Sequence, residues 1–205
     1  MRSAYAHIAL RTRQVILALC ISLSLSAQVT DRDLFDVYQR EDMSVWKAYV
    51  DTHIDLPYEY GYCGYIVAEA KKEGADERLM QEAKTCVARF RQHVETQKGT
   101  LPVGHYEMYM SAVYVYELRL KESIHPFKSM SLAKEATRLA PKDPVVLSYY
   151  GTCLFYAPKP FGSKSEALEW FEAAQTYFQT PEWEFCWLRE ANEMYIQQCH
   201  EKLKK

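Results

Sequence analysis

Apolar residues recur every three to four positions along most of this chain, and glycine or proline interrupts the pattern at intervals. Such a spacing places apolar side chains on one face of an α-helix, whereas a half-buried strand would need a spacing of two. Glycine is scarce, with 7 in 205 residues, so the segments between interruptions are not weakened as helices. We therefore expect an all-α fold.

The interruptions also predict where the helices begin and end. Pro57 and Pro144 suit a first helical turn, Gly74 suits a helix end, and Pro141 stops the fifth helix. The connections are short, so neighbouring helices should pack as antiparallel hairpins. The expected spans are 31–52, 57–73, 76–97, 103–122, 126–140, 144–156, 165–178 and 182–203.

The start of the chain has the pattern of a secretory signal peptide. Three arginines precede an apolar run from Val15 to Leu25, which Ser26 and Ala27 follow. That run is shorter than the roughly 20 apolar residues that span a bilayer, and no later segment is apolar enough to span. The pattern predicts cleavage after Ala27, no transmembrane segment in the mature chain, and an exported protein that is periplasmic or secreted.

With residues 1–27 as signal peptide, residues 28–205 are expected to form a single domain. This domain has 22 basic and 27 acidic residues, a net charge of −5. A mildly acidic surface argues against nucleic acid as a partner. A lipid anchor on Cys20 is the alternative to cleavage after Ala27. It is disfavoured because Leu19 stands where a small residue is expected.

The cysteines of the domain leave two interpretations open. Cys63 and Cys86 are almost equally far from Gly74, so their sulfurs can meet if a helical hairpin turns there, and export permits a disulfide. Small buried residues with free thiols are the other interpretation. An odd number leaves at least one thiol unpaired within the chain. The five are Cys63, Cys86, Cys153, Cys186 and Cys199.

A repeat motif lies between residues 129 and 178. Small Ala136 precedes Pro141 by five positions, at the end of one helix. The next helix carries a large-large-small-large pattern, and the one after it a small-aromatic-small pattern. These positions are Leu147, Tyr150, Gly151 and Leu154, then Ala167, Phe171 and Ala174.

This motif resembles the tetratricopeptide repeat (TPR), a helical repeat in which antiparallel pairs stack. The resemblance implies a TPR-like right-handed solenoid for the whole domain, because isolated repeats cannot bury their faces and at least three are usually needed. Upstream positions such as Gly64 and Ala112 are compatible with further first helices. Residues 31–73 could form either a true repeat or a cap.

The connection Ala157–Ser165 contains a glycine, a lysine and two serines, as a phosphate-binding loop would. However, Gly162 is followed by Ser163 instead of lysine, and no strand precedes it, so the Walker spacing fails. We expect a corner between two helices, with Ser163 or Ser165 as N-cap. The Pro-Phe-Gly connector resembles those of exported bacterial repeat proteins related to periplasmic solute-transporter accessory subunits.

The TPR resemblance implies a concave binding surface on the first helices of the pairs. The family's carboxylate clamp uses lysines and asparagines, and the matching positions here, such as Val145 and Thr152, hold neither. A neutral, aromatic groove would suit a protein segment or a small apolar ligand. The candidate binding residues are Ser148, Tyr149, Thr152, Tyr109 and Tyr60.

Tyrosines cluster in residues 57–65 and again in 106–116, where they are more often core than binding site. On a helix Tyr58, Tyr62 and Tyr65 share one side and Tyr60 lies on another, so one set should pack and the other can line a surface.

We find no catalytic or metal-binding signature in the sequence. Histidines have no ligand spacing on one helix face, and the ladder Glu166, Glu169 and Glu172 fits a solvated surface. We expect no enzyme, no metal and no cofactor. Two functional hypotheses remain. One is a scaffold for protein–protein interaction in the cell envelope. The other is a solute-binding accessory protein of a periplasmic transporter, which requires an enclosed aromatic pocket.

Overall fold

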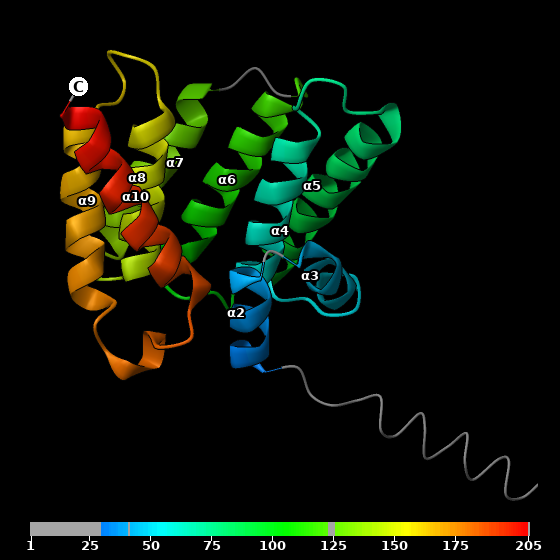
Figure 1. The fold of residues 1–205 in the computed structure, drawn as a ribbon, viewed down its shortest axis with the longest axis horizontal. Helices are drawn as coiled ribbons and strands as arrows, with labels where there is room; N and C mark the ends of the chain where they lie inside the picture. Colours follow the sequence, from blue (N-terminus) through cyan, green and yellow to red (C-terminus); the bar gives the residue numbers. More distant parts are fainter. Residues whose placement is uncertain (1–29, 41, 123–125, 205) are drawn as a thin grey trace, which may run out of the picture.

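The computed structural model describes residues 30–40, 42–122 and 126–204. Every regular element in these ranges is a helix, which confirms the all-α prediction (Figure 1). None of the helices in this part of the chain is long and apolar enough to cross a membrane. The predicted signal peptide, residues 1–27, and Cys20 lie outside the described residues.

The helices keep the order that the interruptions predicted, with differences at their ends. They are α2 (Asp31–Gln39), α3 (Met43–Val50), α4 (Leu56–Glu69), α5 (Glu77–Gln97), α6 (His105–Arg119), α7 (Pro126–Leu139), α8 (Pro144–Tyr156), α9 (Lys164–Tyr177) and α10 (Trp187–Leu203), with a short 3-10 helix η1 (Pro181–Trp183) before α10.

The prediction of one helix over 31–52 is wrong, because the chain turns between α2 and α3. A capping box of Thr30 and Asp33 starts α2, and the helix ends at Arg40. The turn brings the rings of Tyr38 and Trp46 within 6.0 Å of each other. In a straight helix, eight residues would separate them by about 12 Å along the axis. The ring contact between Tyr38 and Trp46 is therefore possible only because the chain forms two short helices and not one.

The prediction of a helix over 182–203 is wrong at its start. Residues Pro181–Trp183 form η1, and α10 begins at Trp187. The ring of Trp183 packs edge-on against Phe178 at the end of α9, with ring centroids 5.6 Å apart. This contact holds the 3-10 turn against α9, so the chain changes direction before α10 starts.

Side-chain caps explain where α8 and α9 begin. Asp143 accepts hydrogen bonds from the backbone N–H groups of Val145 and Val146, at 2.9 and 3.1 Å. Ser163 accepts one from the N–H of Glu166 at 3.0 Å, which confirms the predicted N-cap. A side chain at Gly162 would collide with the carbonyl oxygen of Leu154. The connection is therefore a tight corner between two helices.

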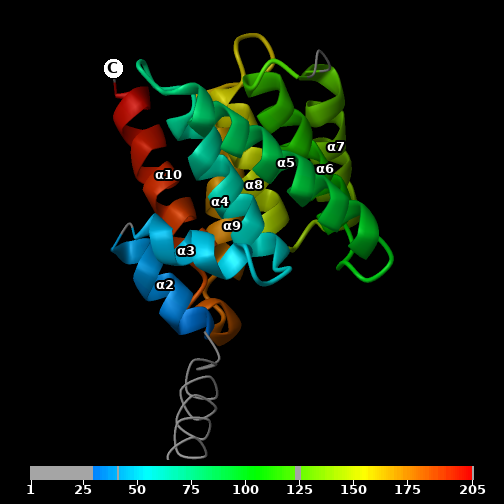
Figure 2. The same ribbon diagram turned by 90° about the vertical axis from the view of Figure 1, so that its right-hand side faces the viewer.

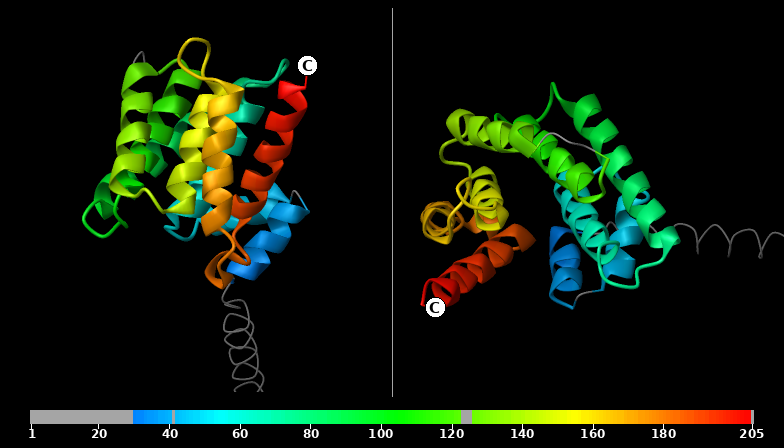
Figure 3. Two further views of the ribbon diagram at one scale, coloured as in Figure 1. Left: turned by 90° about the vertical axis from the view of Figure 1, so that its left-hand side faces the viewer. Right: turned by 90° about the horizontal axis from the view of Figure 1, so that it is seen from above.

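Consecutive helices from α4 to α10 pack on one another along a curved row (Figures 1 and 2). Every second helix also makes contact, α4 with α6, α6 with α8, and α8 with α10. The view from above shows the row curving from α4 and α5 through α6 and α7 to α8 and α9 (Figure 3, right). The first part of α10 lies inside this curve, close to α2.

The residues of the repeat motif form the core between α7, α8 and α9. Ala136, Ala167, Phe171 and Ala174 are completely buried, and Leu147, Tyr150 and Leu154 are nearly so. A Cβ at Gly151 would lie 2.8 Å from the ring of Phe171, so this position has room only for glycine unless the ring moves. The spacing in the sequence therefore does mark packing positions.

Candidate functional site

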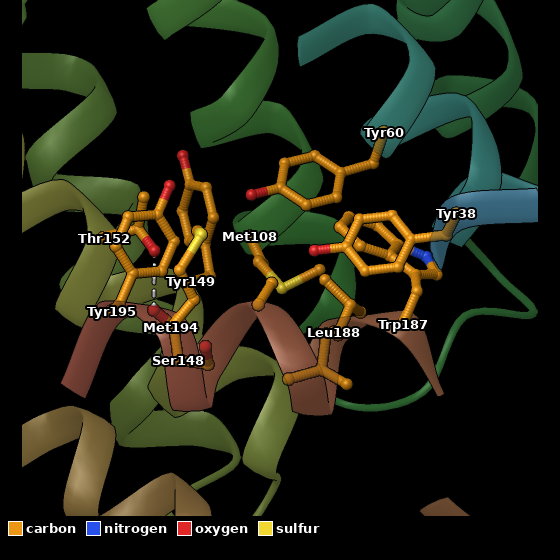
Figure 4. Close-up of a pocket in the computed structure, with 12 residues that line it drawn as sticks. Tyr38, Tyr60, Met108, Ser148, Tyr149, Thr152, Trp187, Leu188, Met194 and Tyr195 are labelled. Atoms are coloured by element: carbon orange, nitrogen blue, oxygen red, sulfur yellow. Dashed lines mark hydrogen bonds between the residues drawn. The ribbon is translucent and has the colours of Figure 1, made fainter. Parts of the chain in front are cut away.

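A cavity of about 200 Å³ lies inside the curve of helices. Five helices contribute to its wall, α2, α4, α6, α8 and α10, and Figure 4 shows their side chains converging on it. The lining residues are Tyr38, Tyr60, Met108, Val145, Ser148, Tyr149, Thr152, Trp187, Leu188, Ala191, Met194 and Tyr195.

Helical spacing explains how α8 and α10 line this cavity. Val145, Ser148, Tyr149 and Thr152 recur at three to four residues and so share one face of α8. Trp187, Leu188, Ala191, Met194 and Tyr195 recur in the same way on α10. One face of α8 and one face of α10 therefore line the same cavity.

Tyr60 of α4 lies at the centre of the aromatic wall. Its ring stacks on Trp187 at 6.1 Å and meets Tyr149 edge-on at 5.9 Å. Figure 4 shows its hydroxyl directed from α4 toward the side of the cavity formed by α8. Tyr116 donates a hydrogen bond to the backbone carbonyl of Tyr60 at 3.0 Å, which fixes this turn of α4.

Hydroxyl groups provide the polar part of the cavity wall. The Tyr149 hydroxyl is 2.8 Å from that of Ser111, which donates to the carbonyl of Ser129. Thr152 donates to the carbonyl of Ser148 at 3.0 Å. Burial raises the pKa of the Tyr60 and Tyr149 phenols above the ordinary value, so both remain neutral at physiological pH.

All twelve lining residues are uncharged at neutral pH. Such a wall provides no partner for an ionised carboxylate, ammonium or phosphate group that would lose its hydration on entering. Aromatic, aliphatic and thioether side chains instead favour burial of apolar surface, with a few hydroxyls available for orientation. The cavity is therefore chemically suited to a neutral and mainly apolar group.

No family model, curated protein or solved structure matches this chain.

Four of the five candidate binding residues lie together at this cavity. They are Tyr60, Ser148, Tyr149 and Thr152. Tyr109 is instead only 1% exposed and packs edge-on against Phe90 and His105, with ring centroids 5.7 and 5.8 Å away. Tyr109 therefore belongs to the hydrophobic core and does not line the cavity.

Sequence reasoning missed the contributions of α2 and α10. Tyr38 comes from α2, whose place in the fold had no sequence signal. Trp187, Ala191 and Tyr195 had one, because they recur at helical spacing within the predicted last helix. That helix was expected to be only another member of the row, and its inward position depends on the turn around η1.

The cysteine pair also comes together, at the hairpin of α4 and α5. Both side chains are buried, and the Sγ atoms of Cys63 and Cys86 are 2.6 Å apart.

The other tyrosines of α4 differ in exposure. Tyr58 and Tyr62 are buried against neighbouring helices, whereas Tyr65 is exposed.

Two carboxylate–histidine pairs lie outside the cavity. Glu59 of α4 is 1% exposed and 2.7 Å from Nδ1 of His93, and burial raises the pKa of Glu59 despite this hydrogen bond. Asp143 lies 2.9 Å from Nε2 of His105. Burial opposes the charge of Asp143, but His105 and the two backbone N–H groups outweigh it and hold its pKa below the ordinary value.

No group of three or more histidine, cysteine or acidic side chains is placed to hold a metal ion within the described ranges.

Proposed function

We propose that this chain is an exported, TPR-like binding protein whose central cavity takes a small, neutral and mainly apolar solute. The observation that carries the proposal is the uncharged aromatic wall formed by faces of α2, α4, α6, α8 and α10. An accessory role beside a periplasmic transporter would use such a solute-binding cavity. Export and the TPR-like right-handed solenoid are part of the proposal.

Two features support the TPR-like arrangement. The helices that line the cavity, α4, α6, α8 and α10, are every second member of the row, as expected for the first helices of successive pairs. The small and aromatic positions of the motif are buried between paired helices. On this view α2 and α3 cap the row, and Tyr38 reaches from the cap into the cavity.

Burial of the cavity wall favours a small solute over an extended peptide. Val145, Ser148 and Tyr149 are each only 6–7% exposed, so α8 does not offer these side chains to a long segment. The first part of α10 covers the inner side of the curve, where a peptide would lie in an open groove (Figure 3). A compact ligand that enters the cavity avoids this obstacle.

The test uses indole as a neutral aromatic probe, titrated into the folded protein and followed by calorimetry. We expect saturable binding to the wild type. The variant Ala191→Leu fills the cavity from α10 and should weaken binding roughly tenfold or more, equivalent to about 1.4 kcal/mol. The matched control is Ala88→Leu on the exposed side of α5, which should bind indole as the wild type does.

Native mass spectrometry of the purified protein extends this test to a retained solute. A neutral small molecule that is present in the wild type and lost in Ala191→Leu would support the proposal and identify its class. Equal indole binding by both variants would contradict the assignment of the cavity. No indole binding together with no retained molecule would contradict the function itself.

A scaffold for protein–protein interaction is the second candidate, and an exposed aromatic pair favours it. Phe127 of α7 and Phe161 of the connection before α9 are 70% and 54% exposed, and their rings meet edge-on at 5.5 Å. Exposed apolar side chains that cluster can mark contact surfaces. In a pull-down from envelope extract, a stoichiometric protein lost in Phe127→Ser/Phe161→Ser but kept in Val103→Ser would favour this function.

A further inference from the structure

The two sulfurs at the hairpin of α4 and α5 lie in direct contact. Sγ of Cys63 and Sγ of Cys86 are 2.6 Å apart, and both residues are free thiols in this structure. Both residues are buried, at 0% and 6% exposure, and they come from neighbouring antiparallel helices. Their side chains therefore point directly at each other across the hairpin.

The two cysteines differ in their access to solvent. A second cavity of about 400 Å³ lies beside α3, α4 and α5, and Cys86 is part of its wall whereas Cys63 is not. A reagent that enters this cavity meets Cys86 first. The rest of the wall is polar and largely charged, comprising Lys47, Asp51, Tyr62, Arg78, Gln81, Glu82, Thr85 and Arg89.

Ion pairs hold the charged wall in place around Cys86. Arg89, about one helical turn beyond Cys86, binds Asp51 at 2.7 Å, and Lys47 binds the other oxygen of Asp51 at 2.7 Å. Lys47 also lies 3.3 Å from Glu82. Arg78 adds a third cation, so the wall of this cavity carries three cations and two carboxylates. This excess of positive charge suits a small zwitterionic or acidic molecule.

We propose that Cys63 and Cys86 form a disulfide by exchange with a small, charged disulfide that reaches Cys86 through this cavity. The Cys86 thiolate attacks one sulfur of the external disulfide and releases the first small thiol. The Cys63 thiolate then attacks Sγ of Cys86 and releases the second. Both protein thiols are oxidised, the external disulfide is reduced to two thiols, and the two protons from the cysteines end on these thiols.

The order of the two attacks follows from burial. Loss of hydration raises the pKa of the Cys63 thiol well above its ordinary value. Because the thiolate is the nucleophile, Cys63 is a poor first attacker and is also out of reach. Once Cys86 carries a mixed disulfide, Cys63 is the neighbouring sulfur, so the second step is intramolecular.

The test treats the full chain with oxidised glutathione, quenches it with acid, alkylates the remaining thiols and maps the peptides. We expect the peptide of Cys63 linked to that of Cys86, and a midpoint of thermal unfolding roughly 5–10 °C above that of the reduced protein. Full alkylation of both cysteines after this treatment would overturn the proposal.

Single variants separate the two roles. Cys63→Ser should accumulate one glutathione adduct on Cys86, whereas Cys86→Ser should leave Cys63 unmodified in the folded protein. Cys199→Ser is the matched control, because Cys199 is equally buried in α10, and it should still give the linked peptide. An adduct on Cys63 in the Cys86→Ser protein would contradict the proposed route even if the wild type forms the disulfide.

Discussion

Two glycines on different helices have aromatic rings packed against them, and these rings come from different parts of the chain. Gly151 of α8 has the ring of Phe171 from the next helix against it, where a Cβ would lie 2.8 Å from the ring. Gly61 of α4 has two indoles against it, and a Cβ there would lie 2.8 Å from both Trp46 and Trp187. One contact is local to a hairpin, whereas the other joins α3, α4 and α10.

This difference separates the region around α8 and α9 from the region around Gly61, which closes the cavity. Around Gly151 the motif positions of residues 129–178 pack consecutive helices. Around Gly61 the rings of Tyr38, Trp46, Trp187 and Tyr60 interlock, with centroid distances from 5.3 to 6.1 Å. Stability should depend on both regions. The second supplies more of the cavity wall, through Tyr38, Tyr60 and Trp187, whereas the first reaches the wall where Phe171 stacks on Tyr195 at 5.2 Å.

The largest expected effects come from removing the rings themselves. Phe171→Ala and Trp46→Ala should each lower the free energy of unfolding by about 3–5 kcal/mol, because both side chains are almost fully buried. Trp46→Ala should weaken indole binding more than Phe171→Ala, because Trp46 packs on two rings of the cavity wall and Phe171 on one. Urea unfolding and calorimetry measure the two effects, and Val103→Ala, at a 67% exposed site, should stay within about 0.5 kcal/mol of wild type.

Smaller effects are expected from filling the two glycine sites. Gly61→Ala and Gly151→Ala should each cost about 1–3 kcal/mol, because the added methyl group forces a ring to move. At Gly61 the displaced rings are those of Trp46 and of Trp187, which lines the cavity, so indole affinity should fall. Gly151→Ala displaces Phe171, which reaches the wall only through Tyr195, and should lower the affinity less. Equal loss of affinity in the two variants would show that both regions control the cavity.

The smallest effects distinguish the two carboxylate–histidine pairs by their pH dependence. The pKa of Asp143 is lowered in the folded protein, so its contribution is present above about pH 4 and is lost as the pH falls through the folded pKa. Asp143→Asn keeps the cap of α8 but should cost about 1 kcal/mol at neutral pH. This difference from wild type should vanish in acid.

Glu59 should behave in the opposite way, because its folded pKa is raised. The wild type then loses stability as the pH rises from about 4 through the folded pKa, and Glu59→Gln should lack this loss. Urea unfolding of both variants between pH 3 and pH 8 gives the two profiles. Parallel profiles for the Asp143 and Glu59 variants would contradict the opposite directions assigned to them.

The sequence predicted features that depend on residues close together in the chain better than features that depend on residues far apart. Helix bounds from α5 to α9 followed from proline, glycine and apolar spacing, since these act within a few residues. The faces of α8 followed from the repeat motif, which placed Ser148, Tyr149 and Thr152 together. Tyr109 does not line the cavity with the other four candidates, because spacing along a helix does not say whether another side chain covers that face.

The sequence by itself determined the all-α class, the order of the helices and the packing positions of the repeat, because these depend on local propensity and periodicity. Tertiary structure decided that α2 turns back on α3, that α10 lies inside the curve and that Tyr38, Trp187 and Tyr195 meet Tyr60 at one cavity. These contacts join residues far apart in the chain, and their geometry depends on which aromatic rings fit beside Gly61 once the helices have packed.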